Sequence, residues 1–244
     1  MFERPHHQRV AEALAALDAD LLAENRCLFG GGTAIALRYG EYRESMDIDF
    51  LVSNIEGYRQ LRQLLTSDQG LSALARKGAK IQQTGELRAD QYGIRSTVRV
   101  GGIDIKFEIV LEARIELDVP GKEDRVGDIA TLTVLDMAAS KLLANSDRWA
   151  DDSVFSRDVI DLAMMHPGSA LLRRAATKAR QAYGNSIDSD LAKAVNALLT
   201  RQGRMDRCME VLQMIPAVTP ALLRQRIKAL LPRVPGAKGK APTP

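Results

Sequence analysis

Asp47 and Asp49 form a pair of acidic residues within an otherwise apolar segment, residues 46–52. The segment alternates as a β-strand does, so the two carboxylates project from the same face. Two like charges at this spacing repel each other unless a cation screens them, and carboxylate oxygens are ligands that hard divalent cations such as Mg²⁺ prefer. The pair therefore predicts a metal site. A pair of exposed acids at a strand edge is the alternative interpretation.

A run of glycines lies shortly before this acidic pair. Gly31, Gly32 and Thr33 follow the apolar residues 27–29 and precede helix-forming residues, an order that indicates a strand, a glycine turn and a short helix. Glycines let a phosphate chain approach the backbone, a helix N-terminus offers free N–H groups, and Thr33 adds a hydroxyl donor. The segment predicts a phosphate-binding turn, with an ordinary glycine turn as the alternative.

A third carboxylate would complete a two-metal site. Residues 94–111 predict a β-hairpin with its turn at 101–102, and Asp104, Lys106 and Glu108 share the polar face of its second strand. Glu108 is the best candidate for the third ligand, with Lys106 beside it, and Asp104 on the same face is an alternative. The competing interpretation is the solvated face of an antiparallel strand.

A second group of charged residues lies later in the chain. Lys141 is a lone cation among the small and apolar residues 138–144, a setting that suits a phosphate partner. Asp136 precedes it, and Asp158 and Asp161 are three residues apart and share a helix face. In isolation, such acids are more often partners in surface ion pairs than active-site groups.

The hydrophobic pattern predicts the elements that position these residues. Apolar residues recur at helical spacing over 8–25 and again after residue 52, and the pattern is helical from about residue 129 to 232. We therefore expect an α+β fold, with a β-containing domain over residues 1–125 and a helical domain over 126–232. Residues 233–244 are rich in Pro, Gly, Ala and Lys, which predicts a disordered tail.

Composition narrows the class of protein. The 244 residues are 45% hydrophobic and 27% charged, which is typical of a folded globular chain. The sequence contains no apolar run long enough to cross a membrane and no secretory signal in its polar N-terminal segment, so we expect a cytoplasmic protein with no membrane partner. Two cysteines and three histidines without metal-ligand spacing argue against a structural zinc site or a disulfide framework.

Charge is unevenly distributed along the chain. Residues 167–244 contain 14 Lys and Arg against 4 Asp and Glu, whereas residues 1–166 contain 20 against 27. An acidic first part suits metal ions and a basic second part suits a polyanion, with a solvated helical surface as the alternative. The basic part includes two clusters at helical spacing, one of Arg173, Arg174, Lys178 and Arg180 and the other of Arg201, Arg204 and Arg207.

Several segments, taken in order, resemble the four motifs of a known enzyme family. Residues 29–40 (FGGGTAIALRYG) and 43–50 (RESMDIDF) are similar to the first motif of AbiEii/AbiGii-type nucleotidyltransferase toxins, which belong to the DNA polymerase beta-like nucleotidyltransferase superfamily. Lys106-Phe107-Glu108 resembles the second motif, where Asp is more common than Glu. Asp136 with Lys141 resembles the third motif, and residues 157–162 (RDVIDL) resemble the fourth. The resemblance covers about residues 27–163.

The resemblance implies a fold and a reaction. The fold is an N-terminal nucleotidyltransferase-type mixed β-sheet with flanking helices, followed by a helical domain that completes the active site and binds the acceptor. The reaction is the transfer of a nucleoside monophosphate from an NTP to an acceptor, dependent on Mg²⁺ (with Mn²⁺ as an alternative), and pyrophosphate leaves.

The roles that the resemblance implies for individual residues fall into three groups. The metal ligands are Asp47, Asp49 and Glu108, of which Glu108 can instead help to deprotonate the acceptor hydroxyl. The nucleotide-binding residues are Gly31, Gly32, Thr33, Lys106 and Lys141, with Lys141 neutralising charge on the triphosphate. The acid that orients Lys141 or the acceptor is Asp158 or, alternatively, Asp161.

The resemblance also implies partners. Members of this family inhibit growth as toxins of type IV-like toxin–antitoxin systems, some by adding nucleotides to the acceptor end of tRNA, and a cognate antitoxin, usually a winged-helix DNA-binding repressor, restrains them. We therefore expect an RNA acceptor, tRNA above all, held by the basic helical part. Two alternatives remain: a nucleotidyltransferase with a small-molecule acceptor such as an antibiotic, and a nucleotide-binding module without catalysis.

Overall fold

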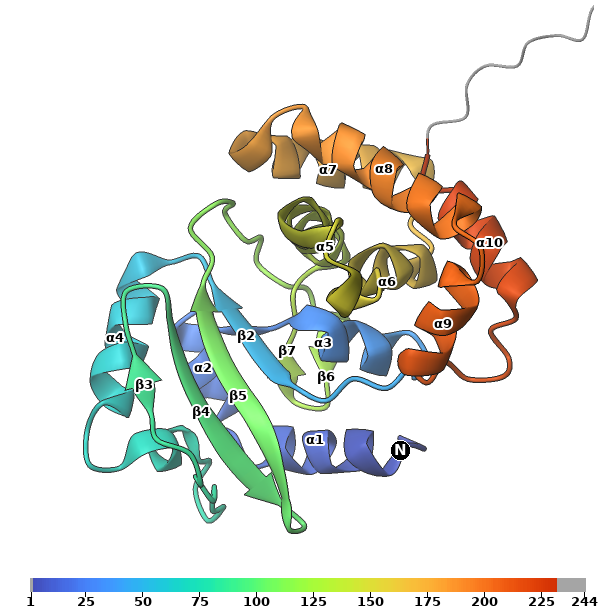
Figure 1. Ribbon diagram of the computed structural model, residues 1–244. Helices are drawn as coiled ribbons and strands as arrows, with labels where there is room; N and C mark the ends of the chain where they lie inside the picture. Colours follow the sequence, from blue (N-terminus) through green and yellow to red (C-terminus); the bar gives the residue numbers. More distant parts are fainter. Residues whose placement is uncertain (1, 232–244) are drawn as a thin grey trace, which may run out of the picture.

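A mixed five-stranded β-sheet forms the centre of the N-terminal part. The computed structural model describes residues 2–231, so the tail predicted at 233–244 lies outside the described residues. Strand order across the sheet is β1-β2-β5-β4-β3, with β2 and β5 parallel and the other neighbours antiparallel (Figure 1). The strands are β1 (Leu28–Phe29), β2 (Ile48–Val52), β3 (Arg88–Ala89), β4 (Gly93–Val100) and β5 (Ile103–Leu111).

The predicted hairpin is confirmed. Strands β4 and β5 are joined by Gly101 and Gly102, whose φ angles are positive (+56° and +79°). Residues other than glycine rarely adopt such φ angles. Phe107 and Ile109 of β5 are buried on one face of the sheet, while Lys106 and Glu108, which alternate with them, lie on the other. This alternation leaves one face of β5 free to carry polar groups.

The N-terminal helices differ in one respect from the predicted pattern. Instead of one helix over 8–25, the chain forms α1 (Pro5–Ala15) and α2 (Ala19–Glu24). The break occurs because the Asp18 N–H donates to the carbonyl of Leu74 and the Asp18 side chain caps α2 by accepting from the Leu21 N–H. The helix expected after residue 52 is confirmed as α4 (Ile55–Leu65), which Asn54 caps.

The C-terminal part is helical from α5 onward. A short hairpin, β6 (Arg125–Val126) and β7 (Ile129–Ala130), precedes it, so the helical pattern starts at Val134 rather than at 129. The α-helices are α5 (Val134–Arg148), α6 (Arg157–Met165), α7 (Ser169–Tyr183), α8 (Ser186–Thr200), α9 (Arg204–Val211) and α10 (Pro220–Lys228). Short 3₁₀ segments span Gly70–Leu74 and Asp152–Val154. No helix within residues 2–231 is long and apolar enough to cross a membrane.

Helix α3 (Gly31–Arg38) connects the sheet with the helical part. It packs against β2 on one side and against α5 and α6 on the other, and Figure 1 shows it between the sheet and these helices. One continuous cluster of buried apolar residues extends from α1 to α10. The expected α+β fold with helices toward the C-terminus is therefore confirmed, and α5 and α6 lie where they can contribute side chains beside the sheet.

Candidate active site

A single row of residues crosses the polar face of the sheet. Asp49 on β2 is the register partner of Glu108 on β5, Glu108 is the partner of Arg95 on β4, and Arg95 is the partner of Arg88 on β3. At the other end of the row, the Gly30 N–H donates to the Asp49 carbonyl at 2.8 Å. Register partners share a face of the sheet, so the row runs from the glycine turn through two acids to two arginines.

The carboxylates of Asp47 and Asp49 lie close enough for their charges to act on each other. Asp47 directly precedes β2, and neither side chain forms a hydrogen bond or ion pair with any residue in the range 2–231. Burial, reinforced by the charge of Asp47, raises the pKa of Asp49 to about 6, although Lys106 acts in the opposite direction. The pair therefore has the electrostatics of a site that favours a divalent cation.

The glycine turn is packed directly against this site. Gly31 has φ +68°, and a side chain there would strike the Asp49 carboxylate; a side chain at Gly32 would strike the guanidinium of Arg43. Thr33 is buried, and its hydroxyl donates to the Ser45 hydroxyl at 2.8 Å. The glycines thus make room for protein side chains as well as leaving backbone N–H groups at the start of α3, and the Thr33 hydroxyl has a partner within the protein.

Glu108 is held by two cations. Its Oε1 accepts from Arg95 Nε at 2.5 Å and its Oε2 from Lys106 Nζ at 2.5 Å. Burial raises the pKa of Glu108, but the hydrogen bonds and charges of Lys106 and Arg95 outweigh it and leave the pKa below its ordinary value. Among residues 2–231 no three acidic, histidine or cysteine side chains are arranged to hold a metal ion. Glu108 thus lies beside Asp49 in the sheet with both carboxylate oxygens paired to cations, and its role as a third metal ligand stays a prediction.

Lys141 bridges the two candidate acids of α6. Its Nζ lies 3.0 Å from Asp158 Oδ1 and 2.7 Å from Asp161 Oδ2, and all three side chains are buried. Asp158 also accepts two hydrogen bonds from Arg148, at 2.7 and 2.9 Å. Both acids that the sequence offered as partners of Lys141 therefore contact it.

Asp161 is the most completely paired acid of this group. Its carboxylate accepts from Arg43 Nε and Nη2 at 2.6 and 2.9 Å and from the Tyr42 hydroxyl at 2.6 Å. Burial raises the pKa of Asp161, but Arg43 and Lys141 together hold it well below its ordinary value. Arg43, Tyr42 and Arg148 were not identified as site residues from the sequence. Arg43 lies within the segment 43–50 that resembles the first motif, which was the available signal.

Asp136 does not contact this group, although the sequence paired it with Lys141. It lies at the start of α5, fully buried, where it accepts from the Asp118 N–H at 2.8 Å and from the Thr133 hydroxyl at 3.0 Å, and it pairs with Lys178 of α7. Residues five apart on a helix do not share a face, which separates Asp136 from Lys141. Asp136 therefore fastens α5 to α7.

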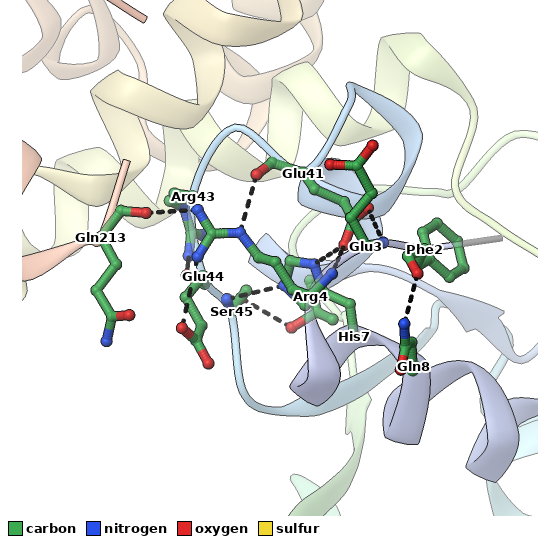
Figure 2. Close-up of polar contacts among 11 residues, drawn as sticks. Phe2, Glu3, Arg4, His7, Gln8, Glu41, Arg43, Glu44, Ser45 and Gln213 are labelled. Carbon is green, nitrogen blue, oxygen red and sulfur yellow. Dashed lines mark hydrogen bonds and ion pairs between the residues drawn. The ribbon is translucent and has the colours of Figure 1, made fainter. Parts of the chain in front are cut away.

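The segment that leads into Asp47 is fastened by the N-terminus. The Glu41 carboxylate accepts hydrogen bonds from the backbone N–H groups of Glu3 and Arg4, at 2.7 and 3.1 Å, and from Nδ1 of the His7 ring, at 2.8 Å (Figure 2). The Ser45 N–H donates to His7 Nε2 at 3.2 Å, so Nδ1 carries the proton that goes to Glu41. Burial lowers the pKa of His7, which favours this neutral form. Residues 41–45 are thereby held in place ahead of the acidic pair.

Comparisons with known proteins identify the family. The model of the family described as "Nucleotidyl transferase AbiEii toxin, Type IV TA system" matches residues 12–235. The search of curated proteins found no match. Among solved structures, JHP933 from Helicobacter pylori is similar in fold, with a TM-score of 0.52 at 17% identity over 94% of this chain and 90% of that one. The nucleotidyltransferase toxin MenT4 (Rv2826c) from Mycobacterium tuberculosis H37Rv gives a TM-score of 0.48 at 17% identity, over 91% of this chain and 82% of that one. With its match extending over nearly the whole chain, this protein belongs to the AbiEii family of nucleotidyltransferase toxins and is a nucleotidyltransferase.

Proposed function

We propose that this protein transfers a nucleoside monophosphate from an NTP to an RNA acceptor in a reaction that requires a divalent cation. The observation that carries the proposal is the pair Asp47 and Asp49 against the glycine turn, which forms no hydrogen bond or ion pair within residues 2–231, and where burial and mutual repulsion raise the pKa of Asp49 to about 6. Oxygen ligands of this charge fit Mg²⁺ or Mn²⁺. Such an ion supplies positive charge against the phosphoryl group during transfer.

The protein's own groups account for binding of the triphosphate. The N–H groups at the start of α3 follow directly from the glycine turn, and a helix N-terminus favours anions. Behind the turn, three cations (Arg43, Lys141 and Arg148) face two carboxylates (Asp158 and Asp161), which leaves the buried network with one net positive charge. Arg43 approaches Gly32 closely, so this charge acts across the turn.

The acceptor is proposed to be RNA, tRNA above all. Several of the cations expected to bind it have partners within the protein: Lys178 pairs with Asp118 and Asp136, Arg180 with Asp188, and Arg201 and Arg204 with Asp152. Among the described residues, these pairs reduce the positive charge that is free to bind RNA, and Arg173 and Arg174, which are exposed on α7, are the members of the first cluster that stay available. The cognate antitoxin that the toxin family implies is proposed to be a winged-helix DNA-binding repressor.

The test is a transfer assay with the purified protein. The protein is incubated with each α-labelled NTP, Mg²⁺ and total RNA, and the label is followed into RNA by gel electrophoresis, with Asp49→Asn as the inactive control. Label on tRNA from the unaltered protein alone supports the proposal. Label that enters only small molecules would assign a small-molecule acceptor, and no metal-dependent incorporation at all would contradict the proposal.

A further inference from the structure

Arg88 and Arg95 lie on the side of the acidic pair that faces away from the glycine turn. The sheet order places β1 and the turn on one side of Asp49, and β5, β4 and β3 on the other. In phosphoryl transfer the attacking and leaving oxygens are roughly in line. With the triphosphate at the glycine turn, the acceptor therefore approaches over β5 and β4, where these arginines are.

The two arginines are direct register partners on adjacent antiparallel strands. Like charges opposite each other destabilise a sheet, so the pair needs anions nearby. Arg95 has two, Glu108 and Asp90, whereas Arg88 pairs with Glu86, and both side chains of that pair are more than 70% exposed. An exposed ion pair of this kind is weak and easily exchanged. Arg88 is thus available to an external anion.

Glu108 cannot serve Arg95 and a metal ion equally. Arg95 Nε occupies one carboxylate oxygen at 2.5 Å and Lys106 occupies the other. If Glu108 turns to a cation at Asp47 and Asp49, Arg95 loses its closest partner. The Arg95 side chain, which is 41% exposed, is then left on the acceptor side of the site beside Arg88. A guanidinium fork matches the geometry of a phosphate group.

We propose that Arg88 and Arg95 bind a backbone phosphate of the acceptor RNA, and that Glu108 masks Arg95 until a divalent cation draws Glu108 away. The proposal rests on the proposed function, since it takes the acceptor to be RNA and the site to bind metal. It adds a second, metal-dependent contact to the acceptor, supplied by the sheet rather than by the helices.

The strand pair contains a matched control for this proposal. Arg99 and Asp104 form a second cross-strand pair on the same face of β4 and β5, with N–O distances of 2.6 and 2.8 Å and the same 41% exposure of the arginine. Neither residue is in register with Asp49. A single substitution in the Arg95–Glu108 pair changes the charge of this face by the same amount as the matching substitution in the Arg99–Asp104 pair. A general electrostatic effect on RNA binding should therefore be equal in the two variants.

The first experiment measures binding of a 5′-labelled single-stranded oligoribonucleotide by fluorescence anisotropy, without NTP and in EDTA. Glu108→Gln unmasks Arg95, so it should bind about fivefold more tightly than the unaltered protein, the size of one freed phosphate contact. Asp104→Asn should bind as the unaltered protein does. Equal tightening in both variants, or none in either, would overturn the proposal.

The second experiment repeats the titrations in Mg²⁺ over a range of salt concentrations. Adding Mg²⁺ should tighten binding by the unaltered protein, and Arg95→Gln should lose this gain. The double variant Arg88→Gln/Arg95→Gln should lower the slope of log affinity against log salt by about 0.7 for one phosphate of a single strand. Arg99→Gln should retain both the gain and the slope. If Arg99→Gln loses the Mg²⁺-dependent gain as Arg95→Gln does, the proposal is wrong.

The transfer assay separates failure of this proposal from failure of the proposed function. If the unaltered protein labels RNA and binds the oligoribonucleotide but the Arg88 and Arg95 variants match the Arg99 control, only the phosphate contact is disproved. If the unaltered protein shows no metal-dependent transfer to RNA and no binding, the proposed function itself is wrong, and the contact with it.

Discussion

The acidic pair at the start of β2 and the ion network between α5 and α6 are both built from charged side chains, but they differ in how those charges are paired. Asp47 and Asp49 have no partner among residues 2–231, and the pKa of Asp49 rises to about 6. In the network, every carboxylate oxygen of Asp158 and Asp161 is paired, and the pKa values of both acids fall. The first region needs a cation from outside, whereas the second already contains its cations.

This contrast separates two roles that the sequence assigned to one active site. Unpaired like charges are costly for folding, so a protein that places them together favours a ligand that relieves the repulsion. Removing one member of a paired buried network strongly destabilises the fold, because the charge that remains is then uncompensated. The acidic pair is thus expected to govern catalysis with little effect on stability, and the network is expected to govern both.

The largest expected effect is on catalysis at the acidic pair. Asp47→Asn or Asp49→Asn removes a metal ligand, and nucleotide transfer should fall by about a thousandfold or more. The metal-free variants should be no less stable than the unaltered protein, because neutralisation relieves repulsion. Transfer assays measure the loss of activity, and thermal melts in EDTA measure the stability of the metal-free variants. Asp104→Asn, an acid on the same sheet face with its own arginine, is the control, and a retained rate in Asp49→Asn would remove the metal assignment.

The next effect is on stability of the network. Asp161→Asn leaves Arg43 and Lys141 buried without a full counter-charge, so the free energy of unfolding should fall by about 3–5 kcal/mol. Urea denaturation measures it. The exposed Asp104→Asn should change the unfolding free energy little. A near-neutral result for Asp161→Asn would mean that the network relaxes to admit water, and the contrast between the two regions would disappear.

Lys141 sharpens the comparison, because each of its carboxylate partners retains an arginine when it is removed. Lys141→Ala should therefore lower turnover by about a hundredfold, through loss of positive charge behind the triphosphate, with a smaller loss of stability than Asp161→Asn. Steady-state kinetics and urea denaturation of the same preparations give both values. If stability falls as in Asp161→Asn while turnover is kept, Lys141 acts only as an ion-pair partner.

The smallest effect is the dependence of stability on pH. Asp49 has a pKa of about 6 in the folded protein against an ordinary value of 3.8, so the folded state binds this proton more tightly than the unfolded state. As pH rises from about 4 to 6, the metal-free protein should lose about 2–3 kcal/mol relative to Asp49→Asn. Asp161 acts in the opposite sense, since its low pKa stabilises the fold above pH 4 and the benefit is lost on acidification. Urea denaturation in EDTA across this pH range measures the difference, and Mg²⁺ should abolish it. Parallel pH curves would contradict the raised pKa.

Much of the local structure was predictable because it depends on short-range patterns. The β4–β5 hairpin follows from alternation around Gly101 and Gly102, and α4 from apolar residues at helical spacing after Asn54. The predicted helix over 8–25 failed because Asp18 contacts Leu74, more than fifty residues away. The local sequence pattern indicates which secondary-structure element a residue belongs to, but it does not show a contact with a residue so far away in the chain.

The sequence by itself determined that Asp47 and Asp49 lie two residues apart at the start of a strand, next along the chain to a glycine turn, since both features depend on residues a few positions apart. The strand begins at Ile48, one residue after Asp47, and not at residue 46 as the alternation predicted. Only the tertiary structure decided which charges meet. Arg43 pairs with Asp161, which is 118 residues away in the sequence, and Lys178 pairs with Asp136, which is 42 residues away. Arg95 pairs with Glu108 because strand register places them opposite each other. Whether a charge is free to bind a ligand depends on the partner that packing brings to it, and charge counts along the chain do not contain that information.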